Sequence, residues 1–179
     1  MNKLMLFFLF FLMVGLLMAC TSSNIDKSEK TLEDSQKEGN EVKEVDYKIP
    51  DDGWDLSLIF DHSIVYDDGN EHIYTFVGNK ETLGFIGPLP IVAGNLGKHL
   101  WFYFGEENVL NKPVIVKGIK QGTDELIDLH SGSFYEGARV SADSVNMPSN
   151  MKFPSAGLWK VLVYIDGQFY DSIVIEVEY

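Results

Sequence analysis

The chain has 179 residues, of which 45% are hydrophobic and 13% aromatic, and its 27 acidic and 14 basic residues give a net charge of −13. This acidic balance argues against nucleic-acid binding, which needs clustered Lys and Arg to neutralise phosphate charge. The single cysteine excludes an intramolecular disulfide framework and a Cys-rich zinc module. The hydrophobic fraction is too high for a wholly disordered chain, so the sequence indicates a folded domain.

The N-terminal residues have the pattern of an export signal. A positive start, MNK, precedes an uncharged run over 4–19 that is shorter than a membrane-spanning helix requires. Residues 17–20 read LMAC, so Cys20 directly follows the run, and this ending resembles a bacterial lipobox. The resemblance implies cleavage before Cys20 and a diacylglycerol on its sulfur, which would anchor the chain at the extracytoplasmic face of the cell membrane. The alternative is an uncleaved anchor helix in which Cys20 is an ordinary interfacial residue.

The residues after Cys20 predict a spacer. Between 21 and 46 there are eight acidic and four basic residues, no aromatic residue and only four large aliphatic ones. Such a segment cannot bury enough apolar surface to offset its ordering entropy. We therefore expect a signal peptide over 1–19, a lipidated Cys20 with a flexible charged linker over 20–46, and one folded domain over 47–179.

From residue 47 onward, apolar and polar residues alternate in short bursts separated by Gly, Pro, Asn and Asp. These bursts predict strands at 54–60, 62–66, 72–77, 83–86, 99–104, 113–119, 125–129, 157–165 and 170–179. No long window carries the apolar stripe of a helix. Short strands with frequent turn signals are typical of an all-β, antiparallel, immunoglobulin-like sandwich, and a closed barrel of similar size is the alternative.

The clearest alternation lies near the C-terminus. Over 157–165 it places Trp159 on the inward face and Lys160 on the opposite face, where we expect the lysine to be solvated. The dipeptide DG at 166–167 predicts a hairpin turn into the last strand. Burial between the sheets is expected from three tryptophans, Trp54, Trp101 and Trp159.

Two stretches carry a family resemblance. Residues 84–104 (GFIGPLPIVAGNLGKHLWFYF) and 148–177 (PSNMKFPSAGLWKVLVYIDGQFYDSIVIEV) resemble a family of Gram-positive bacterial lipoproteins that share a domain of unknown function. The resemblance implies an immunoglobulin-like sandwich and a location in the cell envelope. It implies no catalytic residue, because the family has none assigned.

Two places near one turn could hold a metal ion. His62 and His72 could face each other across a hairpin, with Asp61 and Glu71 beside them. The turn over 67–71 (DDGNE) carries the oxygen ligands that calcium prefers, but it lacks the EF-hand spacing. The simpler interpretations are a polar cross-strand pair and a solvated turn. We therefore expect no metal and no cofactor.

The sequence gives only weak signs of a catalytic site. Residues 130–133 (HSGS) place hydroxyls beside an imidazole, but no nucleophile elbow is present, and a loop explains the composition. Glu106 and Glu107 are adjacent in sequence, which would point them to different sides of an extended chain, whereas glycoside hydrolysis needs two carboxyls facing one cleft.

The segment 132–153 shows little alternation and is predicted to be irregular. It contains Tyr135 and Arg139, the only arginine of the chain, and both are candidate contacts to a ligand or partner. The alternative for Arg139 is a structural ion pair that ties the loop to the sandwich.

The sequence thus favours a non-enzymatic, lipid-anchored envelope protein whose immunoglobulin-like domain has a binding or structural role. The expected partners are the membrane, through the lipid on Cys20, and an envelope protein or glycan, with no nucleic acid. The alternatives are an envelope inhibitor or accessory factor, and a lipoprotein that binds a small molecule or metal. A hydrolase is the last alternative.

Overall fold

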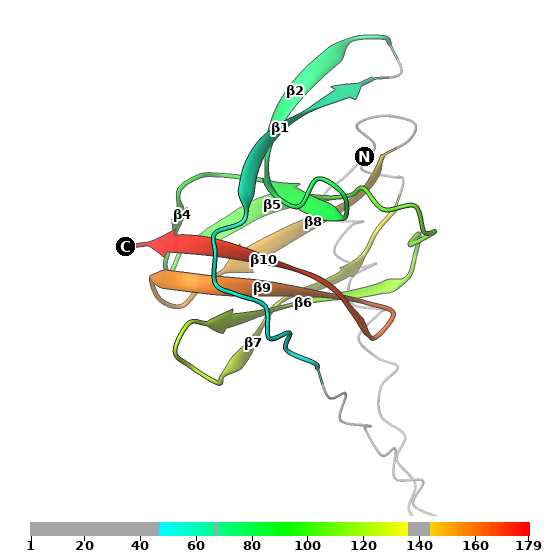
Figure 1. Ribbon diagram of the computed structural model, residues 1–179. Coiled ribbons are helices and arrows are strands. Elements are labelled where there is room, and N and C mark those ends of the chain that lie inside the picture. Colours follow the sequence, from blue (N-terminus) through cyan, green and yellow to red (C-terminus); the bar gives the residue numbers. More distant parts are fainter. Residues whose placement is uncertain (1–46, 67, 136–143) are drawn as a thin grey trace, which may run out of the picture. The chain divides into compact units, whose positions relative to one another are not determined.

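The structure is a computed structural model that describes residues 47–66, 68–135 and 144–179 (Figure 1). These residues belong to one compact unit, residues 43–179. Ten strands make up the fold: β1 (Leu58–Val65), β2 (Glu71–Gly78), β3 (Leu83–Ile86), β4 (Ile91–Val92), β5 (Leu96–Tyr103), β6 (Pro113–Lys120), β7 (Leu126–Ser133), β8 (Val145–Lys152), β9 (Gly157–Ile165) and β10 (Gln168–Glu178). The described part of the chain contains no helix long and apolar enough to cross a membrane.

The strands form two five-stranded sheets that pack as a sandwich, which confirms the predicted all-β class (Figure 1). One sheet has the order β1-β2-β3-β5-β8, and the other has the order β4-β10-β9-β6-β7. Neighbouring strands are antiparallel except for β4, which pairs in parallel with the end of β10 through Ile91 and Val177. This two-residue edge strand is not among the strands that the sequence predicts.

The core lies between the two sheets. Trp101 on β5 and Trp159 on β9 are both buried there, and Phe153 packs against Trp159 with ring centroids 5.5 Å apart. Inward-facing valines and isoleucines of β6, β9 and β10 fill the remaining space. Trp54 does not join this core. It is half-buried on the outer face of the second sheet, so the prediction that it packs between the sheets was wrong.

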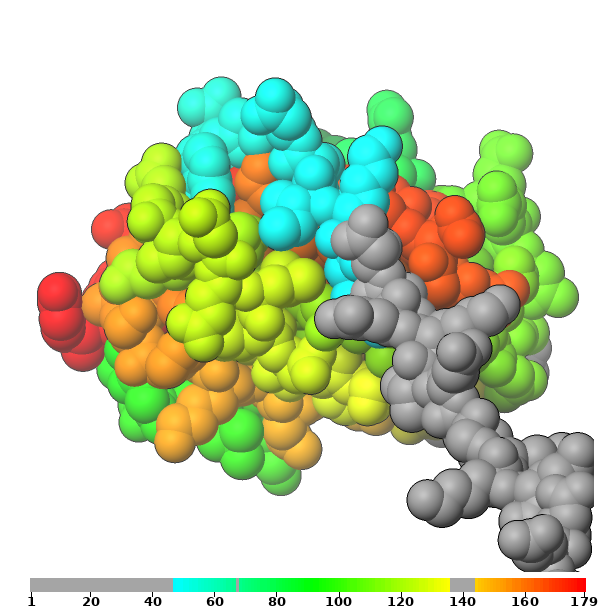
Figure 2. Space-filling view, turned by 90° about the horizontal axis from the view of Figure 1, so that it is seen from below, coloured from blue at the N-terminus to red at the C-terminus, as the bar shows by residue number. Residues whose placement is uncertain are grey.

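Residues 47–57, which we call the N-terminal strap, explain where Trp54 lies. The strap has no regular secondary structure and crosses the outer face of the second sheet (Figures 1 and 2). Beneath it, Ile119, Leu162 and Tyr164 form a small second core. Outward-facing residues of β9 can therefore be apolar, because the strap takes the place of a third layer over them.

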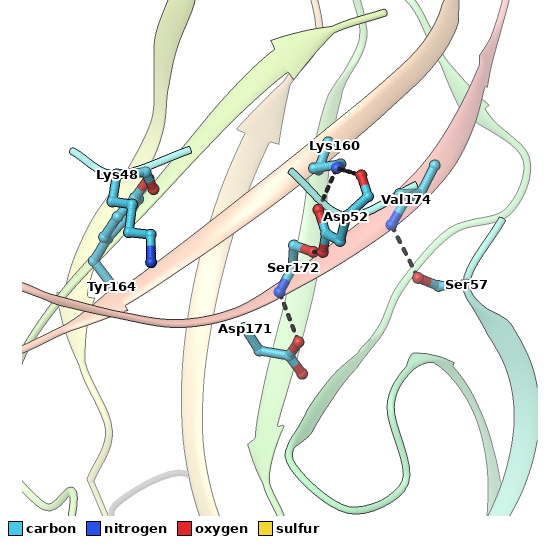
Figure 3. Close-up of polar contacts among 8 residues, drawn as sticks. All are labelled: Lys48, Asp52, Ser57, Lys160, Tyr164, Asp171, Ser172 and Val174. Atoms are coloured by element: carbon cyan, nitrogen blue, oxygen red, sulfur yellow. Dashed lines mark hydrogen bonds and ion pairs between the residues drawn. The ribbon is translucent and has the colours of Figure 1, made fainter. Parts of the chain in front are cut away.

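Polar contacts fasten the strap to β9 and β10 (Figure 3). Lys160 Nζ donates to the main-chain oxygen of Asp52 at 2.5 Å and forms an ion pair with its carboxylate. Ser172 Oγ donates to Asp52 Oδ2 at 2.8 Å, and Tyr164 Oη donates to the Lys48 carbonyl at 2.8 Å. The Lys160 side chain is only 2% exposed, so the expectation that it is solvated was wrong.

The start of β1 is also fastened to β10. The Ser57 amide donates to the Val174 carbonyl at 2.9 Å, and the Val174 amide donates to Ser57 Oγ at the same distance. After Ser57 the chain leaves β10 and pairs only with β2. The strap therefore links the two sheets at this side of the sandwich.

Several predicted boundaries differ from the structure. The strands predicted at 54–60 and 62–66 are not two separate strands. Residues 54–57 belong to the strap, and β1 runs without interruption through both predicted strands. The segment 132–153, predicted to be irregular, contains the end of β7 and all of β8. Met147, Ser149 and Met151 point inward on β8. Pro148 is tolerated because β8 is an edge strand, and its presence concealed the alternation.

Candidate functional site

The two sides of the sandwich differ. On one side β7 and β8 approach each other, and Tyr135 and Asn146 exchange main-chain hydrogen bonds of 3.0 and 3.3 Å. On the other side, β1 ends one sheet and β4 ends the other, with the segment 87–90 (GPLP) between them. The described residues leave two hollows at this open side, and they share Pro90 and Ile91.

The first hollow is an apolar groove of about 470 Å³ between the start of β1, the 87–90 segment and the end of β10. Seven aliphatic side chains form most of its lining: Leu56, Ile59, Val77, Leu89, Ile91, Val174 and Ile175. Three of them are strongly exposed, with Leu56 at 56%, Ile59 at 66% and Leu89 at 49%. Isolated exposed aliphatics are ordinary, but a contiguous exposed patch indicates a contact surface.

The same face of the β1–β2 hairpin is mixed, because Asp61 and Thr75, joined by a hydrogen bond of 2.8 Å that Thr75 Oγ1 donates, lie between Ile59 and Ile73. Ile59 lies opposite Val77, and Ser63 lies opposite Ile73, so these four residues share one face of the hairpin. Ile73 is 71% exposed and is the most exposed aliphatic side chain of this face. In Figure 1 the hairpin extends beyond the neighbouring strands of its sheet, which leaves this face accessible.

The second hollow has about 390 Å³ and lies on the other side of Pro90. His99 lines it together with Met151, Leu96 and Asn95. His99 is only 4% exposed, and both ring nitrogens are buried with no hydrogen bond of good geometry beyond a contact with the backbone of Gly97. Burial lowers the pKa of His99, and the adjacent backbone of Gly97 acts in the opposite direction. The imidazole is therefore uncharged at neutral pH, with one nitrogen able to donate and one able to accept.

The predicted contact residues lie elsewhere. Tyr135 is half-buried in the bridge between β7 and β8, away from both hollows. Arg139 and Cys20 lie outside the described residues, as does Asp67 of the suggested calcium turn. The structure therefore does not bring Tyr135 together with either hollow, and it does not test the other positions.

The two histidines near the hairpin do not pair with each other. His62 lies opposite Tyr74, and His72 lies opposite Ile64. The His62 ring contacts Phe104, with centroids 5.1 Å apart. Among the described residues, no three His, Cys, Asp or Glu side chains converge as metal ligands.

In the adjoining turn both carboxylate oxygens of Asp68 accept hydrogen bonds from Asn70, at 2.9 Å from the amide and 2.7 Å from Nδ2. These bonds lower the pKa of Asp68 and account for its orientation without a cation.

The HSGS motif lies within β7 and its end, not in the predicted loop. His130 pairs with Val116 and Ser131 pairs with Ile115 across the sheet, so His130 and Ser131 point to opposite faces of the strand. Glu106 and Glu107 are exposed in the turn after β5. This arrangement keeps the hydroxyl of Ser131 away from the neighbouring imidazole, as strand geometry requires.

Sequence analysis missed both hollows for a common reason. The groove combines residues from three distant stretches, near 56–59, 89–91 and 174–176, and no local pattern joins them. His99 was recognised only as part of an aromatic strand. The sequence signal that could have pointed to the packing around His99 is the pair Gly87 and Gly97, because an added Cβ at either position would collide with the His99 ring.

Comparisons with known proteins give a fold and a family. No curated protein matches the chain significantly. One solved structure, described as the X-ray crystal structure of "a putative lipoprotein from Bacillus anthracis", is 19% identical and has a TM-score of 0.50. The match covers 72% of this chain and 88% of that one, and it supports the sandwich fold. A family described as "Domain of unknown function (DUF4871)" matches residues 45–175, so the chain belongs to this family.

Proposed function

We propose that the protein is a non-enzymatic lipoprotein of the cell envelope, anchored at the extracytoplasmic face through Cys20, whose sandwich binds an extended apolar segment of another envelope protein. The lipobox resemblance at Cys20 supports the anchor. The fold it shares with a structure described as a lipoprotein of Bacillus anthracis agrees with that location.

One observation carries the binding role: the apolar groove lies directly beside the free edge of β1. Within the described residues, β1 pairs with β2 alone, so its other edge offers main-chain donors and acceptors. An extended peptide can hydrogen-bond to such an edge while its side chains enter a neighbouring groove. Ile59 belongs to both features, since it lies on β1 and lines the groove.

The chemistry of the groove favours a polypeptide over a glycan. Its lining is mostly aliphatic, with no aromatic side chain among the residues that form it. Sugar rings are usually held by flat aromatic faces together with several polar side chains, whereas this groove has no aromatic side chain and only Ser57 and Glu176 as polar ones. Leu, Ile or Val side chains of a partner would bury their own apolar area against Leu56 and Leu89.

Site-specific photo-crosslinking in the native envelope tests this proposal. A photoreactive residue at Ile59 or Leu89 should give an adduct with one defined protein. The matched control is Gln168, which is exposed at the β9–β10 turn and does not line the groove, and it should give no such adduct. Adducts at all three positions, or none at Ile59 and Leu89, would contradict the proposal. An adduct between two copies of this chain would replace the partner with a second copy.

A further inference from the structure

The hydrogen-bonding pattern of β1 determines which of its main-chain groups are free. At the hairpin turn the Tyr66 amide donates to the Asn70 carbonyl at 2.8 Å, so the main chain of Tyr66 points toward β2. At the other end the Ser57 amide donates to the Val174 carbonyl of β10, so the main chain of Ser57 points away from β2. Because successive residues of a strand alternate, the odd-numbered residues of β1 direct their donors and acceptors to the free edge. These residues are Ile59, Asp61, Ser63 and Val65.

The same four residues place their side chains on one face of the hairpin, the face that borders the apolar groove at Ile59. A strand added at this edge would place one residue directly opposite each of them, with Cβ atoms about 5 Å apart. The added residues opposite Ile59 and Asp61 are two positions apart in their own sequence, whichever direction that strand runs. An aliphatic side chain opposite Ile59 gains burial against the groove, whereas the residue opposite Asp61 meets a carboxylate.

Among the described residues, carboxylates are the only charged groups on this surface. Asp61 and Glu71 lie on the hairpin face, Glu176 lines the groove, and all three are exposed. Asp61 accepts a hydrogen bond from Thr75 Oγ1 at 2.8 Å, and Glu71 accepts one from Ser63 Oγ. Within the described chain none of the three carboxylates forms an ion pair, and neither the hairpin face nor the groove lining includes a Lys or Arg.

This charge pattern selects among peptides that the edge alone would accept. An acidic residue opposite Asp61 would bring two like charges together, which is destabilising, whereas a basic residue forms a favourable cross-strand pair. The net charge of −13 acts in the same direction at long range, because it attracts a basic segment and speeds its encounter with the protein.

We propose that the partner segment carries an aliphatic residue and a Lys or Arg two positions apart, so that the first pairs with Ile59 and the second with Asp61. This inference rests on the proposed function, since it requires a peptide at the edge of β1, and it adds the chemistry of that peptide. Main-chain bonds to the edge supply affinity for any extended chain, and the side chains of Ile59 and Asp61 supply selectivity.

Four fluorescent peptides test the proposal by anisotropy, with the full chain in nanodiscs of zwitterionic phosphatidylcholine. VTKTKTV matches the proposed pattern in either direction, VTSTSTV is neutral, and VTETETV is acidic. VKVTTKT has the composition of the first peptide but no aliphatic residue two positions from a lysine. We expect VTKTKTV to bind with a Kd at least about threefold lower than each of the others, which is within the range of one cross-strand charge pair. Raising the salt concentration from about 50 to about 500 mM should remove most of its advantage over VTSTSTV.

Three variants separate this inference from the proposed function. Asp61→Asn keeps an acceptor for Thr75 but removes the charge, so VTKTKTV should lose its advantage over VTSTSTV. Asp124→Asn makes the same charge change in the exposed segment between β6 and β7, away from the groove, and should preserve that advantage. Ser63→Pro removes a free-edge amide without removing a bond to β2, so it should weaken VTKTKTV and VTSTSTV alike.

Equal Kd values for VTKTKTV and VTSTSTV, or for VTKTKTV and VKVTTKT, would overturn the inference and leave edge binding intact. The absence of saturable VTKTKTV binding would overturn it as well. An unchanged Kd in Ser63→Pro would show that the peptides bind elsewhere, which would contradict the proposed function too. The peptide comparison uses the wild-type chain, so it decides the inference even if a variant fails to fold.

Discussion

Trp159 and Lys160 are neighbours on β9 that point to opposite faces, and both are buried. Trp159 is buried between the sheets, where strand alternation predicts it. Lys160 is buried because the strap covers it, with its ammonium 5.0 Å from the centre of the Trp54 ring and paired with Asp52. The alternation therefore identifies the face of a residue correctly, but it does not reveal what lies over that face.

This difference leads to a prediction for three single variants. Trp159→Ala should lower the free energy of unfolding by roughly 3–5 kcal/mol, the usual range for truncating a buried large aromatic residue. Lys160→Ala should lower it by about 2 kcal/mol, because packing against Trp54 and the bonds to Asp52 are lost together. Lys98→Ala, at an exposed position of β5, is the control and should change it by under about 0.5 kcal/mol. Denaturant unfolding measures all three, and equal values for Lys160→Ala and Lys98→Ala would contradict the covering role of the strap.

One buried histidine, His99, and one half-buried histidine, His130, predict a loss of stability in mild acid. Burial lowers the pKa of both His99 and His130 below the ordinary value of 6.5. Protonation therefore favours the unfolded chain, so this contribution is complete above pH 6.5 and is lost as the pH falls through 6.5 toward the lowered values. The buried His99 should contribute more to this loss than the half-buried His130, whose charge solvent screens.

Urea unfolding between pH 7.5 and 5.0 measures this loss. His99→Phe should reduce it, and the exposed His62→Phe should leave it unchanged. The pKa of Asp52 is lowered too: burial alone would raise it, but the bonds from Lys160 and Ser172 outweigh that effect. Its contribution is lost only below about pH 3.8, so it does not overlap with the histidine window. An identical loss in the wild type and His99→Phe would contradict the assignment.

At the scale of elements, the strap acts as a third layer without being a strand. It covers Leu162 and Tyr164, and burial raises the pKa of Tyr164 to about 12, with a smaller contribution from Tyr47. Lys117 adds a contact from β6, with its ammonium 4.1 Å from the centre of the Tyr47 ring. The strap should therefore be required for stability, whereas the charged residues before it should not.

Two truncations test this division. A chain that begins at Glu44 should fold with the melting temperature of the longer protein, because it keeps the whole strap. A chain that begins at Leu58 exposes Ile119, Leu162 and Tyr164 and leaves Lys160 without Asp52. We expect its melting temperature to fall by roughly 10 °C or more, which corresponds to the loss of a few buried apolar side chains. Similar melting temperatures for the two chains would contradict the role of the strap.

The elements also show why some strands were predictable. β9 and β10 are long, rich in β-branched and aromatic residues and joined by DG, so strand propensity and turn chemistry agree. β8 carries Pro148, which argued against a strand, and its inward positions are Met and Ser rather than β-branched residues. β4 has two residues and exists only through its parallel pairing with β10, which no local pattern encodes.

The candidate sites were less predictable than the strands. A possible position across a hairpin singles out His62 and His72, and adjacency in sequence singles out the HSGS motif. Cross-strand register nevertheless separates the two histidines, and strand alternation separates His130 from Ser131. His99 becomes distinctive only when its burial and its lack of a well-formed hydrogen bond are known. These properties depend on how the 87–90 segment and β8 pack around it, which is a tertiary feature.

At the scale of the whole molecule, the two hollows adjoin each other at Pro90 and Ile91, whereas β7 and β8 approach each other through Tyr135 and Asn146. The proposed attachment of the chain to the membrane is the lipid on Cys20.

The last prediction concerns this attachment and rests on the sequence LMAC. Thioether formation requires the sulfur of Cys20, so Cys20→Ser should abolish lipidation and leave either an unprocessed precursor or a protein that is released from the membrane fraction. Two acyl chains hold a protein stably, since each buried methylene contributes about 0.8 kcal/mol, and no other cysteine can replace this one. Mass spectrometry of the wild-type protein from its own membranes should show an N-terminus at Cys20 that carries the added acyl mass. Ser22→Ala, two residues further along, is the control and should be processed normally. A wild-type protein without acyl mass on Cys20 would contradict the lipoprotein assignment, whatever the sandwich binds.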